Sequence, residues 1–533
     1  MALDGESLAL GSYNLSIVGD KLLVNDKSST GKSKSSRSCF GTGNSATKQS
    51  QRTIPLYNIL WAEVAGDSLV IDYAEDVSKT KIRPTKITIP LPPATTAKDT
   101  TTDAPATAEA GADLEAGNAG AQSSPAARAS AWASSLLDHS YDPSTTRRKR
   151  AFVIINPHAG PGGAMRKFET QVRPIFLAAR MELEIVTTTR RGEAEEIVQK
   201  LDLDKYDVIA VASGDGLVYE TFNGLGRRPD AQKALKSVAV VHIPCGSGNA
   251  MACNLYGTHR VSPAALAAVK GVPTALDLVS VTQGNTRTLS FLSQALGVIA
   301  ESDLGTDNLR WMGSARFTYG YITRAVKRAV YPCDISVKVE IDDKAGIKEH
   351  YARHRPDRSS TAPVTKADSV VDGDVGTEVG EGLPPLKYGT INDKVPEGWE
   401  TFSYDNMGQL YCGNMAYIMP DSNIFSAACI NDGMMDLVTV DGDISPFKSL
   451  ELMTLVESGK FFDDSRVRYR KVSAYRITPR NQASGYISID GEGVPFAPFQ
   501  CEIHRGLGLV LSKAGTYEAP GPMNWEKVAV NKS

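Results

Sequence analysis

The feature that most constrains the fold is a pattern repeated between residues 148 and 276, in which an apolar run leads into a turn with a helical stretch behind it. Its members are "AFVIINPHAGPGG", "MELEIVTTTRRG" before the helical "EAEEIVQKL", "DVIAVASGDG" and "VAVVHIPCGSGNAMA". Runs that are apolar on both faces and alternate with helices are typical of parallel strands. The pattern therefore predicts an α/β domain whose parallel sheet is covered on both sides.

The flanking regions show a different periodicity. Residues 1–92 alternate apolar and polar positions in short runs such as "DSLVIDYAE", which predicts a small β-rich module. From about 277 to 514, period-two runs such as "ISVKVEID" and hairpin signals such as "TQGN" predict an antiparallel β-sandwich. The expected fold class is thus an α/β domain with a parallel sheet, followed by an antiparallel β domain and preceded by a β-rich module.

Two polar segments interrupt this order. Residues 93–147 are dominated by Ala, Thr, Pro, Gly and Asp, and residues 344–397 contain "RPDRSSTAPVTKADSVVDGDVGTEVGEG". Such compositions bury too little apolar surface to fold, so we expect a disordered linker and a disordered insertion. Residues 515–533 form a tail.

Composition excludes several classes of protein. The formal net charge of −3 argues against a general nucleic-acid binder. The start "MALDGESLALGSYNLSIVGD" lacks the basic region of a signal peptide, and no apolar stretch reaches the ~20 residues of a membrane helix. The seven cysteines are scattered without CxxC pairs, as expected of reduced thiols. We therefore expect a cytoplasmic chain that meets intracellular membranes only peripherally.

Three glycine-bearing turns follow three of the predicted parallel strands. Small residues expose backbone N–H groups, and each following helix directs its positive end at its turn, so anions bind there. Glycine can also serve a simple chain reversal, but three turns at one sheet edge indicate a phosphate site. The candidate binding residues in these turns are Asn156, Pro157, His158, Ser213, Gly214, Gly216, Gly246, Ser247 and Gly248.

Two better-known nucleotide motifs do not fit these residues. "TGKS" at 30–33 resembles part of a P-loop, but Asp26 replaces the leading glycine. "GSGNAM" is no dinucleotide fingerprint, because Met251 stands where the third small residue belongs.

Taken together, "SGDGLVYETFNGL", "PCGSGNAMA" and "NPHAGPGG" resemble the diacylglycerol-kinase-type catalytic domain of lipid kinases, over about 150 residues. The resemblance implies that residues 148–276 bind ATP, with Mg²⁺ offsetting charge on the transferred phosphoryl group. It also implies that Asp215 is the base that takes the proton of the lipid hydroxyl. The alternative is that Asp215 only caps the helix that begins near Leu217.

A second stretch, "SQALGVIAESDLGTDNLRWMGSARFTYG" at 293–320, is similar to the sphingosine kinase segment. This resemblance implies that Asp303 meets the polar head of a sphingoid base, and that residues 277–514 hold the lipid. A carboxylate suits the cationic amine of such a base, whereas diacylglycerol and ceramide carry no cation. The alternative is that Asp303 and Glu301 belong to a solvated acidic turn.

The resemblance implies further nucleotide contacts. Arg310 and Arg316 match two phosphate-contacting arginines, although they could also be surface arginines on a solvated helix. The turn Asp490-Gly491-Glu492 matches a motif that returns to the nucleotide and its metal, and we expect its two acids to share one face of a strand. Thr188 and Glu220 match less specific contacts.

The chain departs from this family at one place. Some relatives carry lysines in the first glycine turn, where Pro161 and Gly163 stand here, which puts a lysine contact to phosphate in doubt.

Basic stretches could favour anionic membranes. "KSKSSR" and "RRKR" would be drawn to anionic lipid by about 1 kcal/mol for each basic residue. Solvated linker charge is the simpler interpretation, and we prefer it.

These residues predict an ATP-dependent sphingoid base kinase that forms a long-chain-base 1-phosphate. The rival hypotheses are a kinase of diacylglycerol or ceramide, an NAD kinase, and a non-catalytic membrane adaptor. The sequence leaves open the chain length of the base, the metal ligands and the oligomeric state.

Overall fold

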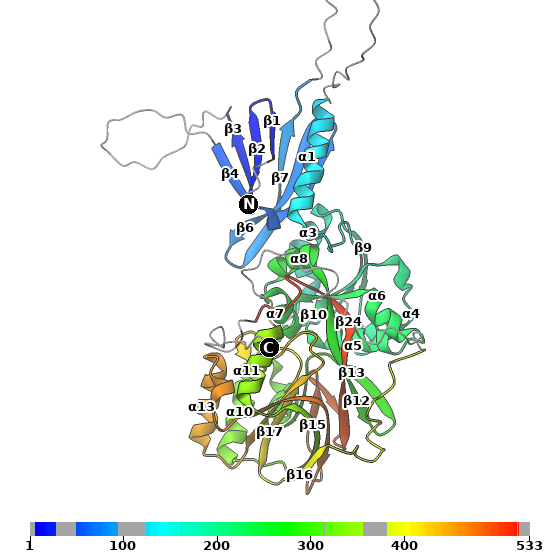
Figure 1. Ribbon diagram of the computed structural model, residues 1–533, viewed down its shortest axis with the longest axis vertical. Helices are drawn as coiled ribbons and strands as arrows, with labels where there is room; N and C mark the ends of the chain where they lie inside the picture. Colours follow the sequence, from blue (N-terminus) through cyan, green and yellow to red (C-terminus); the bar gives the residue numbers. More distant parts are fainter. Residues whose placement is uncertain are drawn as a thin grey trace, which may run out of the picture. The chain divides into compact units, whose positions relative to one another are not determined.

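The computed structural model describes residues 6–27, 50–93, 124–160, 162–312, 315–354, 381–519 and 521. The chain divides into two compact units, one of residues 1–75 with 84–143 and one of residues 76–83 with 144–533 (Figure 1). The second unit holds the glycine-bearing turns.

The first unit contains the expected small β-sheets. A four-stranded antiparallel sheet has the order β1 (Ser7–Leu10), β2 (Tyr13–Val18), β3 (Lys21–Asp26) and β4 (Ser50–Pro55). A three-stranded sheet has the order β5 (Ile59–Ala65), β6 (Ser68–Ser78) and β7 (Lys81–Pro90). Leu8, Leu10, Leu15 and Ile17 are buried at alternate positions, as the period-two pattern predicts.

Helix α1 (Pro125–Ser140) corrects the expected linker over 93–147. Its first turn is capped by the side chain of Ser124, which accepts a hydrogen bond from Ala127 N at 3.1 Å. Trp132, Leu136 and Leu137 recur at helical spacing, are buried, and lie on the side of α1 that contacts β5. The alanines of this stretch are therefore part of a packed helix, while residues 94–123 lie outside the described residues.

The second unit contains the predicted parallel sheet. The strands β8 (Arg150–Ile155), β9 (Glu182–Thr187), β10 (Val208–Ser213) and β11 (Ala239–Pro244) lie in the order β9-β8-β10-β11 and are all parallel. Every residue of β10 and β11 is buried, as expected for strands that are covered on both faces. The prediction of an α/β fold is confirmed.

Helices follow these strands in the chain. Helix α5 packs against β10 and β11, and α8 packs against β11. The helices of this part are α2 (Ala164–Lys167), α3 (Arg173–Ala178), α4 (Glu193–Lys200), α5 (Asp215–Gly226), α6 (Ala231–Ser237), α7 (Ala250–Tyr256) and α8 (Val261–Lys270).

The parallel strands continue into the antiparallel part through one long strand. Strand β24 (Phe499–Ser512) runs parallel to β11 at Val510 and antiparallel to β12 (Val272–Gln283), which itself crosses the expected boundary at 276/277. Beyond β24 the sheet continues in the order β21-β20-β17-β14-β22-β23. The two expected lobes therefore share one sheet, and residues 144–533 form a single compact unit.

The antiparallel part carries the remaining elements. Its other strands are β13 (Thr286–Ser290), β14 (Ser293–Gly297), β15 (Cys333–Ile341), β16 (Glu400–Tyr404), β17 (Met407–Gly413), β18 (Tyr417–Met419), β19 (Ser422–Asn423), β20 (Met435–Asp441), β21 (Arg468–Pro479), β22 (Ile487–Ile489) and β23 (Glu492–Val494). Its helices are α9 (Val298–Leu304), α10 (Ala315–Lys327), α11 (Lys344–His354) and α13 (Pro446–Glu457).

The expected disordered insertion at 344–397 is also corrected in part. Helix α11 occupies its start and buries Ile347 and Tyr351. Near its end, the backbone N–H groups of Lys387 and Tyr388 donate to the buried carboxylate of Glu502 at 2.7 and 2.9 Å. These two ends fold because they have buried partners far away in the sequence, whereas residues 355–380 lie outside the described residues.

In the described part of the chain, no helix is long and apolar enough to cross a membrane. The cysteines at 245, 253, 333, 412, 429 and 501 are free thiols, and all but Cys429 are buried.

Candidate active site

The glycine-bearing turns meet at the carboxyl edge of the parallel sheet. A Cβ added to Gly246 would lie 2.4 Å from the Cα of Gly214, and a Cβ added to Gly160 would lie 2.9 Å from the carbonyl oxygen of Cys245. Such distances leave no room for any side chain. The structure thus brings the turns after β8, β10 and β11 together, as the sequence predicts for a shared anion site.

Two asparagine side chains hold these turns in shape. Oδ1 of Asn156 accepts a hydrogen bond from His158 N at 2.9 Å, and Oδ1 of Asn249 accepts one from Gly246 N at 2.9 Å. Asn249 has a left-handed backbone with φ of 56°. The side chain of Asn156 is therefore used inside its own turn.

Asp215 is the first residue of α5, and its carboxylate reaches a neighbouring helix. Oδ2 accepts from Ala250 N at 3.0 Å and Oδ1 accepts from Met251 N at 3.2 Å, which places the carboxylate at the N-terminus of α7. The interpretation of Asp215 as a cap of its own helix is wrong. A Cβ at Gly248 would lie 3.0 Å from Oδ2, so a larger residue there would crowd this oxygen.

The predicted Asp490-Gly491-Glu492 turn lies beside this edge, but its two acids have different environments. Asp490 and Gly491, with φ of 52° and 83°, form the two-residue turn between β22 and β23. The expectation that Asp490 and Glu492 share a strand face is therefore wrong, because only Glu492 is in a strand.

Asp490 stabilises the connection between β13 and β14 through hydrogen bonds. Its buried carboxylate accepts from Ser290 Oγ at 2.6 Å and from the backbone N–H groups of Phe291, Leu292 and Ser293 at 2.9, 3.0 and 2.8 Å. Burial raises the pKa of Asp490 to about 6 although these donors lower it. Both oxygens are engaged inside the protein, which is a structural arrangement.

Glu492 reaches the turn that carries Asp215. A Cβ at Gly216 would lie 2.8 Å from Oε1 of Glu492. The carboxylate of Glu492 also forms an ion pair with Arg191, which lies between β9 and α4. Sequence reasoning missed Arg191, although the quoted "TTTRRG" turn was a signal that could have found it.

Thr188 and Glu220 support that same β9–α4 turn. Glu220 accepts from Gly192 N at 2.9 Å and from Ala194 N at 3.2 Å, so it caps the start of α4. Thr188 is buried, and its N–H donates to Ile155 O at 3.0 Å. Both residues therefore stabilise the β9–α4 turn that carries Arg191.

Asp303 lies on α9, next to the β22–β23 turn. Oδ1 is 3.2 Å from Nη2 of Arg316, and Oδ2 accepts from Ser488 Oγ at 3.3 Å. A Cβ at Gly491 would lie 3.7 Å from Oδ2. Neither Asp303 nor Arg316 belongs to a solvated surface alone, because each contacts the other in a partly buried position.

The neighbouring acid Glu301 has different partners. It accepts from the hydroxyl of Tyr331 and lies 3.4 Å from Nε of Arg324. The structure thus separates the two acids of the segment, and only Asp303 faces the active-site turn. The side chain of Arg310 lies outside the described side chains.

The basic "RRKR" stretch is partly used inside the protein. Lys149 is buried and its Nζ donates to Val269 O at 2.6 Å, while Arg150 pairs with Asp207 at 3.0 Å. The stretch "KSKSSR" lies outside the described residues. Lys149 and Arg150 therefore use their charged groups inside the protein, which weakens the case for "RRKR" as a lipid-binding stretch.

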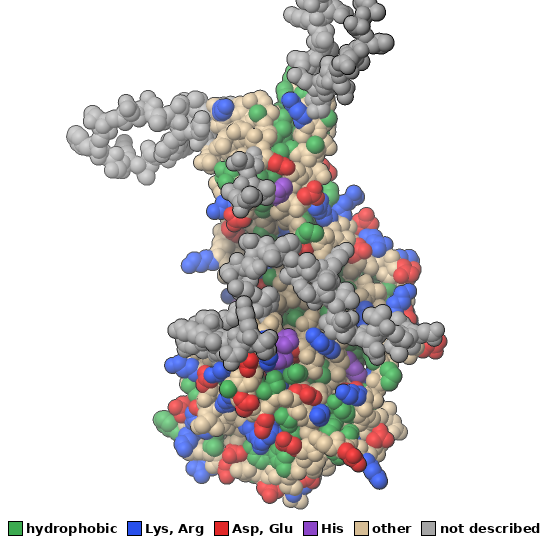
Figure 2. All heavy atoms as spheres, viewed as in Figure 1, with side chains coloured by type: hydrophobic (Ala, Val, Ile, Leu, Met, Phe, Trp, Pro, Cys, Tyr) green, Lys and Arg blue, Asp and Glu red, His purple; other side chains and the backbone are tan. Residues whose placement is uncertain are grey.

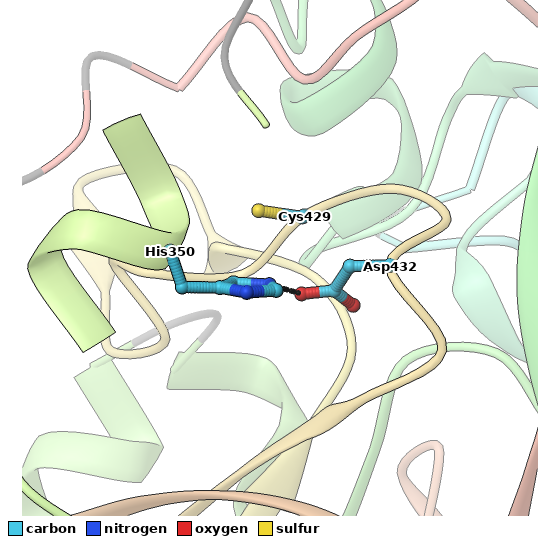
Figure 3. Close-up of side chains that lie close together, drawn as sticks. All are labelled: His350, Cys429 and Asp432. Carbon is cyan, nitrogen blue, oxygen red and sulfur yellow. Dashed lines mark hydrogen bonds and ion pairs between the residues drawn. The ribbon is translucent and has the colours of Figure 1, made fainter. Parts of the chain in front are cut away.

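A second group of titratable side chains lies away from these turns. His350, Cys429 and Asp432 place their ligand atoms within 4.8 Å of one another, with Nε2 of His350 at 2.9 Å from Oδ2 of Asp432 (Figure 3). However, the buried Nζ of Lys471 lies 3.0 Å from the same Oδ2 and 3.0 Å from Oδ1 of Asp436. Burial raises the pKa of Asp432, but the charges and hydrogen bonds of Lys471 and His350 together outweigh this and lower it to about 2. The ammonium occupies the position of a cation, so we interpret the group as a buried ion-pair cluster.

Two family models match the chain. The model described as "Diacylglycerol kinase catalytic domain" matches residues 150–281, which include all three glycine-bearing turns. The model described as "Domain of unknown function (DUF7493)" matches residues 7–142, which agrees with α1 being part of the first unit.

Curated relatives match about 70% of the chain. The chain is 34% identical to sphingoid long chain base kinase 5 of Saccharomyces cerevisiae over 426 residues, which span 72% of this chain and 62% of that protein. It is 33% identical to sphingoid long chain base kinase 4 of Schizosaccharomyces pombe, over 72% of this chain and 79% of that protein. Human sphingosine kinase 1 is 27% identical, over 70% of this chain and 92% of that protein.

Among solved structures, a putative diacylglycerol kinase from Bacillus anthracis aligns with a TM-score of 0.46 and 19% identity, over 69% of this chain and 98% of that chain.

Proposed function

We propose that this chain, which belongs to the diacylglycerol kinase catalytic domain family and is homologous to sphingoid long-chain base kinases and sphingosine kinases, phosphorylates a sphingoid long-chain base. The γ-phosphoryl group of ATP is transferred to the primary hydroxyl, giving the 1-phosphate and ADP. The position of Asp303 is the observation that carries this choice of substrate.

Asp303 and Asp215 are linked through the β22–β23 turn. Gly491 lies beside Asp303, and the next residue, Glu492, reaches Gly216, the neighbour of Asp215. In the proposed complex the amine of the substrate would pair with Asp303 and its primary hydroxyl would lie on the side of Asp215. A partly buried carboxylate favours a cationic head group, which would join Arg316 as a second cation beside Asp303, whereas an uncharged head group gains no ionic attraction there.

The nucleotide phosphates would bind at the meeting glycine-bearing turns. Helix α5 begins at these turns, so its positive end is directed at them. Because the glycines of these turns lack side chains and their backbones lie close together, their N–H groups would be accessible to an anion. Arg191 supplies positive charge at the same edge, in the place of the lysines that the first turn lacks. Arg316 lies near Asp303, where it would orient the head group or contact phosphate.

Asp215 would act as the general base. Two backbone N–H groups hold its carboxylate, so its orientation is set before the substrate arrives. It accepts the proton of the primary hydroxyl as the oxygen attacks the γ-phosphorus.

The residues present fit a magnesium ion. Mg²⁺ binds through one or two carboxylates together with phosphate oxygens, and Glu492 presents a carboxylate beside Gly216. When bound, Mg²⁺ neutralises charge on the transferred phosphoryl group. The side chain of Glu492 would hold it, positioned by Arg191.

Peripheral membrane contact is part of the proposal. Helix α10 begins beside Arg316 and exposes Tyr319, Ile322 and Val326, which are 50%, 37% and 61% exposed, and α13, which packs on α10, exposes Phe447 at 87%. On the face drawn in Figure 2, basic and acidic side chains are interspersed, so no field of one sign dominates there. Contact through apolar side chains is thus better supported than contact through a basic patch.

The experiment for the activity is phosphoryl transfer from MgATP by the purified full chain. Sphingosine, dihydrosphingosine, phytosphingosine, diacylglycerol, ceramide and NAD would be offered side by side, with Asp215→Asn as the control. We expect product only from the sphingoid bases. Product from diacylglycerol or ceramide would support a lipid kinase but contradict the role of Asp303 in choosing the substrate. ATP binding without any product would favour a non-catalytic membrane adaptor.

The membrane contact has its own test. The variant Val326→Ser should reduce co-flotation with phosphatidylcholine vesicles, because it removes an exposed apolar side chain from α10. Val18→Ser is the matched control, since Val18 is 52% exposed in the other unit. Equal flotation of both variants and wild type would contradict this surface.

A further inference from the structure

A buried histidine lies directly behind the proposed base. His242 is on β11, is fully buried, and its Nε2 is 3.0 Å from the carbonyl oxygen of Ser213 on the neighbouring strand β10. Its Nδ1 lies 3.8 Å from Oδ1 of Asp215. Nothing in the sequence patterns singled out this residue.

The contacts of His242 determine where its proton lies. A carbonyl oxygen can only accept a hydrogen bond, so Nε2 must carry a proton. Nδ1 is buried and has no hydrogen-bond partner among the described residues. An unsatisfied buried nitrogen costs free energy, and this one lies 3.8 Å from the carboxylate of Asp215.

The imidazole is neutral in this environment. Burial lowers the pKa of His242, and the charge of Asp215 and the bond to Ser213 offset that only in part. Asp215 is the charged group that acts on the ring among the described residues. Nδ1 of a neutral ring with a proton on Nε2 carries a lone pair, which is directed to the side of Asp215.

We propose that Nδ1 of His242 accepts a hydrogen bond from Asp215 once Asp215 has taken the proton of the substrate hydroxyl, so that His242 is a positioning residue that makes Asp215 a better proton acceptor. This inference rests on the proposed kinase function. An acceptor and a carboxylate 3.8 Å apart have no proton to share at rest, and a small side-chain movement closes the gap when one arrives.

The step balances without any further reactant. The hydroxyl O–H bond breaks and the oxygen forms a bond to the γ-phosphorus. The bond from that phosphorus to the β–γ bridging oxygen breaks, and its electron pair stays on ADP. The proton moves to Oδ1 of Asp215, is shared with Nδ1 of His242, and leaves to water when the products dissociate.

The proposal predicts a particular pH dependence. A proton from solvent can occupy the same position in the free enzyme, and it then removes the acceptor that catalysis needs. Because Nδ1 stabilises that proton, the acid limb of kcat/KM lies at higher pH in wild type than in a variant that lacks Nδ1.

The test uses the full chain with His242→Phe and His242→Gln. Both remove the acceptor at Nδ1, and the glutamine keeps an N–H group that can reach Ser213. We expect kcat to fall about tenfold and the acid limb to move to lower pH by about 0.5–1 unit, with KM for ATP unchanged within about twofold. His504→Gln is the matched control, because His504 is a partly buried histidine on β24 that is bonded to Ser280 and has no contact with Asp215 among the described hydrogen bonds and ion pairs.

Two results would overturn the role of His242. A folded variant with unchanged kcat and an unchanged acid limb would show that His242 does not assist Asp215. A loss of activity without movement of the acid limb would show that His242 has a purely structural role.

The nitrogen NMR spectrum of wild type gives a readout that does not need activity, since we expect the neutral ring with its proton on Nε2. A charged ring at pH 7, or a proton on Nδ1, would contradict the proposal. Absence of lipid phosphorylation by wild type would instead overturn the kinase function and leave the spectrum to decide the state of His242.

Discussion

Two histidine–aspartate neighbours lie in the same unit, and their surroundings differ. At the ion-pair cluster, Nε2 of His350 donates to Oδ2 of Asp432 at 2.9 Å, and Lys471 lies 3.0 Å from the same oxygen. At the glycine-bearing turns, Nδ1 of His242 stands 3.8 Å from Asp215 without any bond. The first histidine is hydrogen-bonded to its aspartate, whereas Nδ1 of the second has no hydrogen bond to a described residue.

The difference separates a structural cluster from a reactive one. A buried carboxylate that is paired with an ammonium and an imidazole has no affinity left for a substrate. Asp215 lies beside Gly216 and Gly248, where a Cβ would meet Glu492 Oε1 at 2.8 Å and Asp215 Oδ2 at 3.0 Å, so larger residues would crowd these carboxylates. Among the described residues Asp215 pairs with no ammonium and lies next to a histidine nitrogen without a hydrogen bond, whereas Asp432 is paired with Lys471, and this contrast makes Asp215 the candidate for chemistry.

The largest expected effect concerns Asp215 of the second pair. Asp215→Asn should lower kcat for sphingosine about 1,000-fold, because the amide cannot take the hydroxyl proton. ATP binding measured by calorimetry and the melting temperature should change little, because the asparagine retains one acceptor for the α7 backbone. Activity within tenfold of wild type would show that Asp215 is not the base.

The next effect concerns the ion-pair cluster. Lys471→Met should lower the free energy of unfolding by about 3–5 kcal/mol, since it leaves the buried carboxylates of Asp432 and Asp436 without their cation. Denaturant unfolding measures this. Lys348→Met is the control, because Lys348 pairs with half-exposed Asp463 at 2.7 Å and should cost less than about 1 kcal/mol. Equal costs would remove the distinction between the cluster and a surface pair.

Asp303→Asn tests the head-group site. The change removes the charge that the amine would pair with, and KM for sphingosine should rise about 10- to 100-fold while KM for ATP stays constant. Steady-state kinetics with each substrate varied separately would show this. Glu301→Gln should leave both KM values within about twofold, since Glu301 contacts Tyr331 and Arg324 instead. A similar rise in both variants would mean that the segment acts through its fold.

The smallest effect uses a partly buried histidine, His504. Burial and the charge of Arg287 lower the pKa of His504 to about 4. Between pH 6.5 and 4 the unfolded chain therefore binds more protons, so stability is lost as the pH falls, by about 2 kcal/mol at pH 5. The melting temperature of His504→Gln should fall less than that of wild type between pH 7 and pH 5. His139→Gln changes an exposed histidine of the other unit, and an equal change there would contradict the assignment to His504.

Much of the fold was predictable because its signals are local. Strands that are apolar on both faces, such as β10 and β11, identify themselves without knowledge of their neighbours. The glycine-bearing turns follow those strands directly, so their meeting at one edge follows from the parallel order. Helices α1 and α11 were missed because Ala-rich and polar segments fold here only by packing on residues distant in the sequence.

The sequence could predict which residues lie near the candidate site, but not which partners their side chains contact. Asp215, Asp303 and Glu492 lie together as expected, while Asp490 turns inward to four donors and Glu220 caps α4. These differences depend on side-chain direction, which a turn residue with positive φ changes and a motif does not encode.

The sequence by itself determined the parallel α/β sheet, the three glycine-bearing turns and the carboxylate at 215, because periodicity and glycine spacing act over a few residues. Only the tertiary structure decided that Asp215 lies against α7 and His242, that Arg191 meets Glu492, and that Lys471 neutralises the cluster at Asp432. Each of those contacts joins residues that are tens to hundreds of positions apart. Their distances are set by how strands and turns stack, and the sequence carries no local signal for them.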